Sequence, residues 1–171
     1  MNKIYTPGHV VNHVLDRAFA ERHPITQMKL QKLVYIGYGW SLAVLDQKLF
    51  DEPIYAWKHG PVIKSLYDEF KHYGAMPIDH HSMNFDFDSS EIHFPRIPDS
   101  DKDVDLVLNI VWGVYKNFKA VTLRNKTHEQ GSPWHTTYRP DRRNLVIPDE
   151  LIKNHFKSKI TEYLENARQA T

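Results

Sequence analysis

Residues 26–67, TQMKLQKLVYIGYGWSLAVLDQKLFDEPIYAWKHGPVIKSLY, decide the fold. The first part predicts a long helix over 26–45, because apolar and small side chains recur at helical spacing. This stripe comprises Leu30, Leu33, Val34, Gly37, Ser41, Val44 and Leu45, with Met28, Tyr35, Ile36, Trp40 and Ala43 on its flanks. A helix that is apolar over so much of its circumference is expected at the centre of the fold.

The start of this helix is marked by two signals. The hydroxyl of Thr26 suits an N-cap, because it can accept a hydrogen bond from a free N–H of the first turn. Ile25 and Leu30 have the spacing of a hydrophobic staple across that cap. Lys29 and Lys32 are expected on the exposed side of the helix, surrounded by solvent.

The second part of the segment predicts a strand followed by another helix. Residues 53–57 are rich in β-branched and aromatic side chains, which favours an extended conformation. Pro61 suits the first position of a helix over 61–73, since its fixed φ is already helical and its missing N–H has no helical partner. Gly60 leaves the preceding turn free of Cβ clashes.

Three further long helices are predicted outside this segment. Thr6 and Pro7 have the N-cap and first-position residues of a helix that ends at His23-Pro24. A second apolar helix, also expected to be central, covers 101–118 with Ser100 as its cap. The last begins at 148, and its inward residues are expected to be Ile152, Phe156, Ile160, Tyr163, Leu164 and Ala167.

Residues 75–100 differ from the rest, being polar and rich in proline. Two short alternations of apolar and polar residues, at 85–88 and 92–94, predict a β-hairpin that turns at Ser89 and Ser90. A loop of this length in a compact domain is often functional. The fold class that follows is mainly α: a compact single-domain helical bundle over 1–171 with a minor β-hairpin or short strands, a short helix at 122–127 and a C-terminal helix at about 148–168.

Composition excludes several classes of function. The chain has no cysteine, so it forms no disulfide or thiolate site, which fits a reducing cytoplasm. Its formal net charge is +1, which gives no global electrostatic case for nucleic-acid binding. No apolar run approaches the roughly 20 residues of a membrane span, and the N-terminus lacks the apolar core of a signal peptide.

Histidines invite a metal or catalytic interpretation. His9 and His13 lie four residues apart, but the zinc-protease pattern also needs a glutamate directly after the first histidine. In a catalytic hypothesis, His128 is a general base that Glu129 orients. We favour a structural role, in which His128 meets the last carbonyls of a helix and Trp134 anchors the following loop. We therefore expect no metal and no cofactor.

Aromatic and basic residues offer two further candidate surfaces. Trp57 is either a binding residue, with His59, or a packing anchor that needs one partner for its indole N–H. The basic turn at 139–143 contributes three arginines. A basic patch for an acidic protein or for nucleic acid would combine Lys29, Lys32, Arg139, Arg142 and Arg143.

Three blocks together resemble the SocA-like, or Panacea, antitoxin domain. The first is KLQKLVY at 29–35, and the second is AWKHGPV at 56–62 with Leu66 and Tyr67. The third is Leu123 with Thr127-His128 and Pro133-Trp134. They occur in the family's order and cover about 5–140, and apolar helix packing alone does not require them.

The resemblance implies an antitoxin, not an enzyme, which neutralises a co-encoded toxin by direct protein contact, in a bacterial or phage system. One branch of the family delivers its toxin to a protease, so a cellular protease is a further implied partner. Homo-oligomerisation stays open. The residues expected to build one shared surface are Trp57, His59, Tyr67, His128 and Trp134, with the loop at 75–100 and the turn at 139–143 as further contact candidates.

Two alternatives remain at this point. An enzyme or metal protein would use His59, His128 and Glu129, which must then converge in a concave site. Nucleic-acid binding through the basic turn would show a steep dependence on salt concentration.

Overall fold

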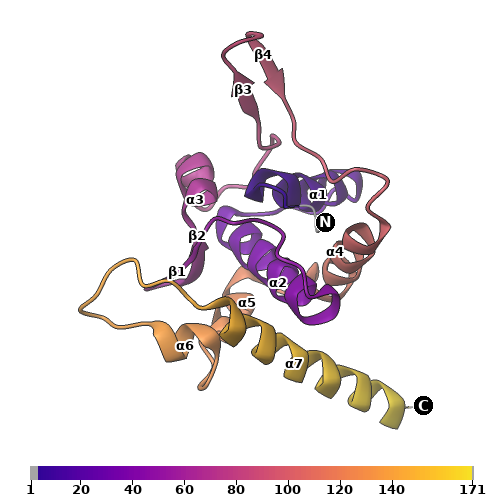
Figure 1. The fold of residues 1–171 in the computed structure, drawn as a ribbon, viewed down its shortest axis with the longest axis vertical. Helices are drawn as coiled ribbons and strands as arrows, with labels where there is room; N and C mark the ends of the chain where they lie inside the picture. The colour runs from indigo at the N-terminus through magenta and orange to yellow at the C-terminus, as the bar shows by residue number, and fades with distance from the viewer. Residues whose placement is uncertain (1–3, 171) are drawn as a thin grey trace.

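The computed structural model describes residues 4–170, and over this range the chain is mainly α, as predicted (Figure 1). The helices are α1 (Pro7–Ala20), α2 (Gln27–Leu45), α3 (Lys64–Phe70), the 3-10 turn η1 (Lys71–Tyr73), α4 (Lys102–Tyr115), α5 (Ala120–Thr127), α6 (Pro133–Thr137) and α7 (Asp149–Gln169). The strands are β1 (Ile54–Trp57), β2 (Gly60–Ile63), β3 (Asn84–Asp86) and β4 (Glu91–His93).

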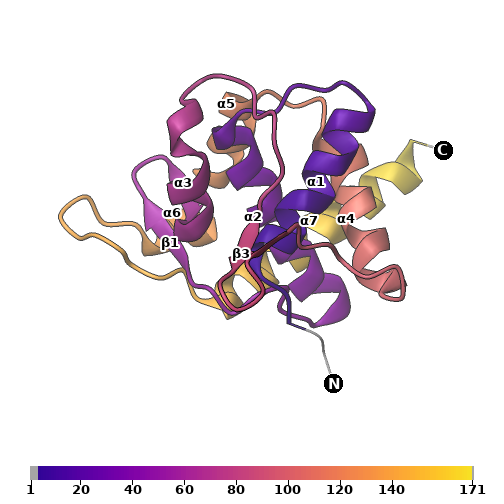
Figure 2. The same ribbon diagram turned by 90° about the horizontal axis from the view of Figure 1, so that it is seen from above.

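Helix α2 lies at the centre, as predicted, with α1, α4, α5, α7 and β2 packed around it. Figure 2 shows α1 and α4 on one side of α2, and α3 with β1 on the other. The hydroxyl of Thr26 accepts a hydrogen bond from the Lys29 N–H, and Ile25 and Leu30 are buried beside this cap. The predicted cap and staple are therefore confirmed.

The second central helix is also present, although its cap differs from the prediction. Helix α4 packs on α2 and buries Val104, Leu108 and Val111. Its cap is Asp101 rather than Ser100, because the Asp101 carboxylate accepts the hydrogen bond of the Val104 N–H at 3.3 Å. An acidic cap is favoured by the positive end of the helix dipole.

The predicted helix start at Pro61 is wrong. Strands β1 and β2 pair antiparallel, with Ala56 opposite Pro61 and Trp57 opposite Gly60, so the chain turns within two residues. Proline tolerates a strand position that donates no ladder hydrogen bond. Gly60 adopts a φ of 107°, a value that glycine favours, and the helix begins only at Lys64.

The last helix is only partly inserted into the bundle. Ile152 and Phe156 are buried as predicted, and Ile160 is half-buried. Tyr163 and Leu164 were predicted to point inward but are 52% and 51% exposed, and Ala167 is exposed too. Figure 1 shows the reason: the C-terminal half of α7 extends past the other helices and has little to pack against.

Residues 75–100 contain the predicted hairpin. Strands β3 and β4 pair antiparallel, and Ser90 in the turn adopts a φ of 57°. Figure 1 shows the hairpin projecting from the end of the molecule near α1, away from the helices.

The packing of α7 on α2 depends on Gly39. A Cβ at this position would lie 2.1 Å from a ring atom of Phe156, whereas a Cβ on Gly113 of α4 would meet no neighbour within 4 Å. We expect Gly39→Ala to lower the free energy of unfolding by about 2 kcal/mol, through overpacking. Gly113→Ala, the matched control, should raise it by about 0.5–1 kcal/mol, through helix propensity. Urea unfolding followed by circular dichroism measures both, and equal effects of the two changes would contradict the packing described here.

Candidate functional site

Four of the predicted surface residues meet around the β1–β2 turn. The Trp134 indole N–H donates to the Trp57 carbonyl at 2.7 Å. The His128 ring lies on Trp134 with ring centroids 3.8 Å apart, and the Trp57 ring meets Tyr67 edge-on at 5.1 Å. We call Trp57, Tyr67, His128 and Trp134 the aromatic cluster. It joins β1, α3, α6 and the end of α5.

Within the cluster the two tryptophans are packing anchors. Trp134 is only 8% exposed, and the Trp57 indole N–H donates to the Asn144 side chain at 3.0 Å. The single partner predicted for the Trp57 indole is therefore present. His59 lies outside these contacts, exposed in the two-residue turn between β1 and β2.

His128 ends helix α5, as predicted. Its Nδ1 lies 2.6 Å from the Arg124 carbonyl, so this nitrogen carries a hydrogen and donates it. Its Nε2 faces the Lys58 carbonyl at 3.4 Å. Burial is the main cause that lowers the pKa of His128, and the Arg124 and Lys32 charges add to it, while the two carbonyls oppose it.

The catalytic arrangement of His128 and Glu129 is not formed. The Glu129 carboxylate pairs with the Lys159 ammonium of α7 at 3.2 Å, while both His128 nitrogens face backbone carbonyls. A base that is oriented by a carboxylate needs the two side chains in hydrogen-bond contact. His128 and Glu129 therefore do not form such a pair.

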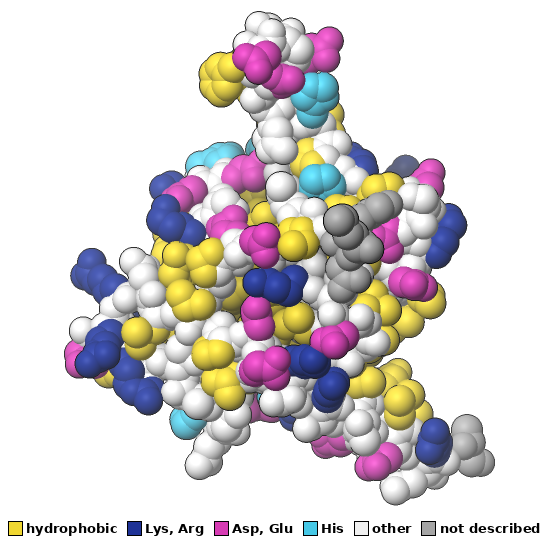
Figure 3. Space-filling model, in the orientation of Figure 1, with side chains coloured by type: hydrophobic (Ala, Val, Ile, Leu, Met, Phe, Trp, Pro, Cys, Tyr) yellow, Lys and Arg dark blue, Asp and Glu magenta, His cyan; other side chains and the backbone are white. Residues whose placement is uncertain are grey.

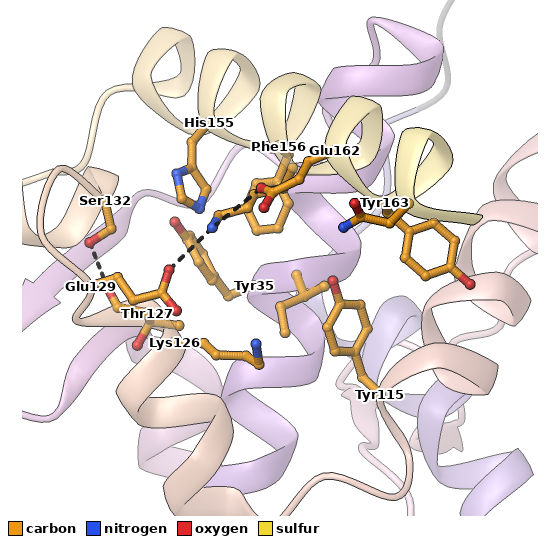
Figure 4. A pocket seen from close by; sticks show the side chains of 13 residues that line it. Tyr35, Tyr115, Lys126, Thr127, Glu129, Ser132, His155, Phe156, Glu162 and Tyr163 are labelled. Carbon is orange, nitrogen blue, oxygen red and sulfur yellow. Dashed lines mark hydrogen bonds and ion pairs between the residues drawn. The ribbon is translucent and has the colours of Figure 1, made fainter. Parts of the chain in front are cut away.

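Glu129 instead lies at the rim of a pocket of about 250 Å³ (Figure 4). Tyr35 and Phe156 line it, with their rings 5.6 Å apart, and so do Lys126 and Lys159. Burial raises the pKa of Tyr35, so its phenol stays neutral.

The prediction that Lys29 and Lys32 are solvated is wrong. They are 7% and 2% exposed. The Lys29 ammonium donates to the Lys116 carbonyl beyond the end of α4 and contacts the His23 ring nitrogen at 3.2 Å. Because α2 is surrounded by other elements, the polar positions on its surface are buried too.

Lys32 connects α2 to the β1–β2 turn. Its ammonium donates to the Pro61 carbonyl at 2.9 Å and lies so close to Gly60 that a Cβ there would approach Nζ to 2.8 Å. Within residues 4–170 no ion pair joins Lys32 to a carboxylate. Burial, with a contribution from the Arg124 charge, lowers the pKa of Lys32 to about 7.

Gln31 makes the neighbouring connection to β2. Its side-chain amide accepts from the Ile63 N–H and donates to the Ile63 carbonyl, both at 3.0 Å. Adjacent polar residues of α2 thus bind the backbone of β2 at two points. Sequence reasoning missed this role of Gln31.

The three arginines of the basic turn are exposed, on a loop that extends to the left of the molecule in Figures 1 and 3. The predicted turn is present, since the Arg142 N–H donates to the Arg139 carbonyl at 3.2 Å. Lys29 and Lys32 are buried, so the predicted basic patch of five side chains does not form. Of these five side chains, Arg139, Arg142 and Arg143 are the exposed ones.

The other histidines build structure. The Nδ1 of His9 accepts a hydrogen bond from the Thr6 N–H at 3.2 Å, next to the predicted cap of α1, and His13 is buried. Within the described part of the chain, no three His, Asp or Glu side chains are grouped so as to hold a metal ion. Over the same residues, no helix combines the length and the apolarity needed to cross a bilayer.

Comparison with known proteins adds two findings. The sequence model of the family described as "Antitoxin SocA-like, Panacea domain" matches residues 30–135. The chain is also similar to "Antitoxin SocA" of Caulobacter vibrioides (strain NA1000 / CB15N), with 30% identity over 152 residues, which cover 86% of this chain and 80% of that protein. No solved structure matches it significantly. The 30–135 match includes the aromatic cluster and Lys32.

The burial of Lys32 predicts a specific dependence of stability on pH. Because its pKa falls from 10.5 to about 7 on folding, the folded chain binds fewer protons than the unfolded chain between these values. The contribution of Lys32 to the free energy of unfolding therefore becomes more favourable as pH rises from about 7 to about 10. Below about pH 7 the folded protein bears the full cost of burying the charged ammonium group.

We expect Lys32→Met to lack this gain, so that the wild type becomes more stable relative to the variant as pH rises through this window. Urea unfolding near pH 7 and near pH 10 measures the difference. Lys157→Met removes an exposed lysine of α7 and serves as the control, with no such trend. A constant difference between wild type and Lys32→Met across this range would contradict the assignment.

Proposed function

Because the chain belongs to the SocA-like, Panacea-domain family of antitoxins, we propose that it is the antitoxin of a toxin–antitoxin pair and neutralises a co-encoded toxin by direct protein–protein binding. The observation that carries this proposal is the similarity to Antitoxin SocA, which extends over 86% of this chain rather than over one motif. The family predicted from the three sequence blocks is thereby confirmed.

We propose that the protein acts by occlusion and not by catalysis. The one His–Glu pair that sequence analysis put forward as catalytic is held apart, with Glu129 on Lys159 and His128 Nδ1 on the Arg124 carbonyl. A stable protein complex typically buries about 1,600 Å² in total, and aromatic and arginine side chains often dominate its energy.

The exposed groups around the aromatic cluster suit such a contact. Trp57 and Tyr67 are half-buried and His59 is exposed beside them, while Arg139, Arg142 and Arg143 extend on the neighbouring loop. Four other motif residues support this surface through hydrogen bonds that hold α2, β1 and the ends of α4 and α5 in place. They are Lys29, Lys32, His128 and Trp134. In this proposal the buried motif residues shape the surface and the exposed ones touch the toxin.

Co-expression with the product of the adjacent gene tests the function. We expect that product alone to stop growth, and this chain to restore growth and to co-purify with it. The amount of toxin, measured by immunoblot, should stay unchanged during rescue, because occlusion leaves the toxin intact.

Several results would count against the proposal. A harmless neighbour, or a toxic one that is neither bound nor rescued, would remove the antitoxin role for this pair. Rescue accompanied by loss of the toxin would replace occlusion with delivery to a protease.

A further inference from the structure

The hairpin formed by β3 and β4 has one apolar face. Phe85 lies directly opposite Ile92, and Phe87 meets Phe85 edge-on with ring centroids 4.9 Å apart. Because side chains alternate across a strand, Met83 and Phe94, each two positions from a member of this pair, are expected on the same face. The face comprises Met83, Phe85, Phe87, Ile92 and Phe94, which are 43%, 51%, 86%, 55% and 51% exposed. We call residues 83–94 the projecting hairpin.

The other face and the tip are acidic. Asp86 lies directly opposite Glu91, a pairing of like charges that destabilises an isolated hairpin, and Asp88 follows in the turn. The Asp86 carboxylate accepts hydrogen bonds from the Asp88 and Ser89 N–H groups, which lowers the pKa of Asp86 and keeps it ionised. The projecting hairpin contains no lysine or arginine. Acidic side chains crowd its end in Figure 3.

Buried hydrogen bonds hold together the two chain segments that lead into and out of the hairpin, which we call its legs. Asn12 of α1 is fully buried; its side chain donates to the Ser82 carbonyl at 2.8 Å and to the Pro95 carbonyl at 2.9 Å. The side-chain Oδ1 of Asn12 accepts a hydrogen bond from the Ser82 N–H at 2.7 Å. Gly8 allows this approach, since a Cβ there would lie 2.9 Å from the Ser82 hydroxyl and 3.1 Å from the Pro95 ring.

A second set of contacts between α1 and the two legs lies one helical turn further along the helix. The Asp16 carboxylate meets His81 at 2.8 Å and Arg96 at 2.9 Å, one residue from each leg. From α3, Glu69 accepts from the Ser82 hydroxyl at 2.9 Å and from the Met83 N–H at 3.3 Å. The base of the hairpin is therefore held by three side chains from α1 and α3, although its apolar face contributes little to the core.

This combination indicates a docking element. A two-stranded hairpin is marginal by itself in water, and exposed contiguous apolar surface usually marks an interaction site. Fixing the legs reduces the entropy lost when the hairpin is captured by a partner. Its three carboxylates repel nucleic acid and anionic membranes, and favour a protein with basic groups.

We propose that the projecting hairpin inserts into the toxin, in an apolar groove bordered by lysine or arginine side chains. This inference rests on the proposed function and adds a second contact to the one proposed around the aromatic cluster. Phe85 and Phe87 fill the groove, and Asp86, Asp88 and Glu91 meet its basic rim.

Titration calorimetry of the full-length chain with the purified product of the adjacent gene tests the inference. We expect Phe87→Ser to weaken binding at least tenfold, since hot-spot aromatics dominate interface energies. Glu91→Lys should weaken binding and reduce its dependence on salt concentration. Leu106→Ser, which removes a side chain of α4 that is 58% exposed, is the matched control and should change the affinity less than twofold.

The outcomes separate the two proposals. If the wild type binds and both hairpin variants bind with the wild-type affinity, the docking assignment is overturned while the antitoxin function stands. If the wild type does not bind, the proposed function fails for this pair, and the docking assignment fails with it. Unchanged melting temperatures for Phe87→Ser and Glu91→Lys, expected because these side chains lie outside the core, show that a loss of binding is not a loss of fold.

Discussion

The hydrogen bond from the buried Lys32 ammonium to the Pro61 carbonyl joins the central helix to the β1–β2 turn, and the aromatic cluster depends on it. The turn approaches α2 closely because residue 60 is glycine, and Gln31 holds β2 from the next position. This fixes the end of β1, where the Trp57 carbonyl receives the Trp134 indole N–H. A buried cation without a carboxylate partner is costly, so its neighbours must be placed well.

The fold was predictable where one local pattern dominated. The apolar circumference of 26–45 indicated a central helix, since such a surface can be buried only by surrounding it. Alternation at 85–88 indicated the hairpin, because its period of two does not fit a helix. The roles of His128 at a helix end and of the Trp57 indole as a single donor also followed from residue chemistry alone. The contact role of the surface residues stays a prediction.

Other features depend on tertiary contacts that no local pattern encodes. Pro61 is equally suited to a helix start and to a strand position without a donor, and the pairing with Ala56 decides between them. Tyr163 and Leu164 have helical spacing, but only the position of α7 shows that nothing covers them. The residue type of Lys32 predicts an exposed side chain, but a helix that is apolar on nearly every side leaves few exposed positions, and Lys32 does not occupy one of them. Asn12 is next to Val11 and three residues before Leu15, so the apolar pattern of its helix also indicated that its side chain is buried.

Lys32 is buried and donates to a backbone carbonyl, and nuclear magnetic resonance measures how far this burial lowers the pKa of its ammonium group. A pH titration of the Lys32 side chain, labelled with ¹³C and ¹⁵N, reports the pKa of its ammonium group in the folded protein. We expect a midpoint near 7 for Lys32, because burial lowers its pKa. A midpoint near 10.5, the ordinary value for lysine, would contradict it.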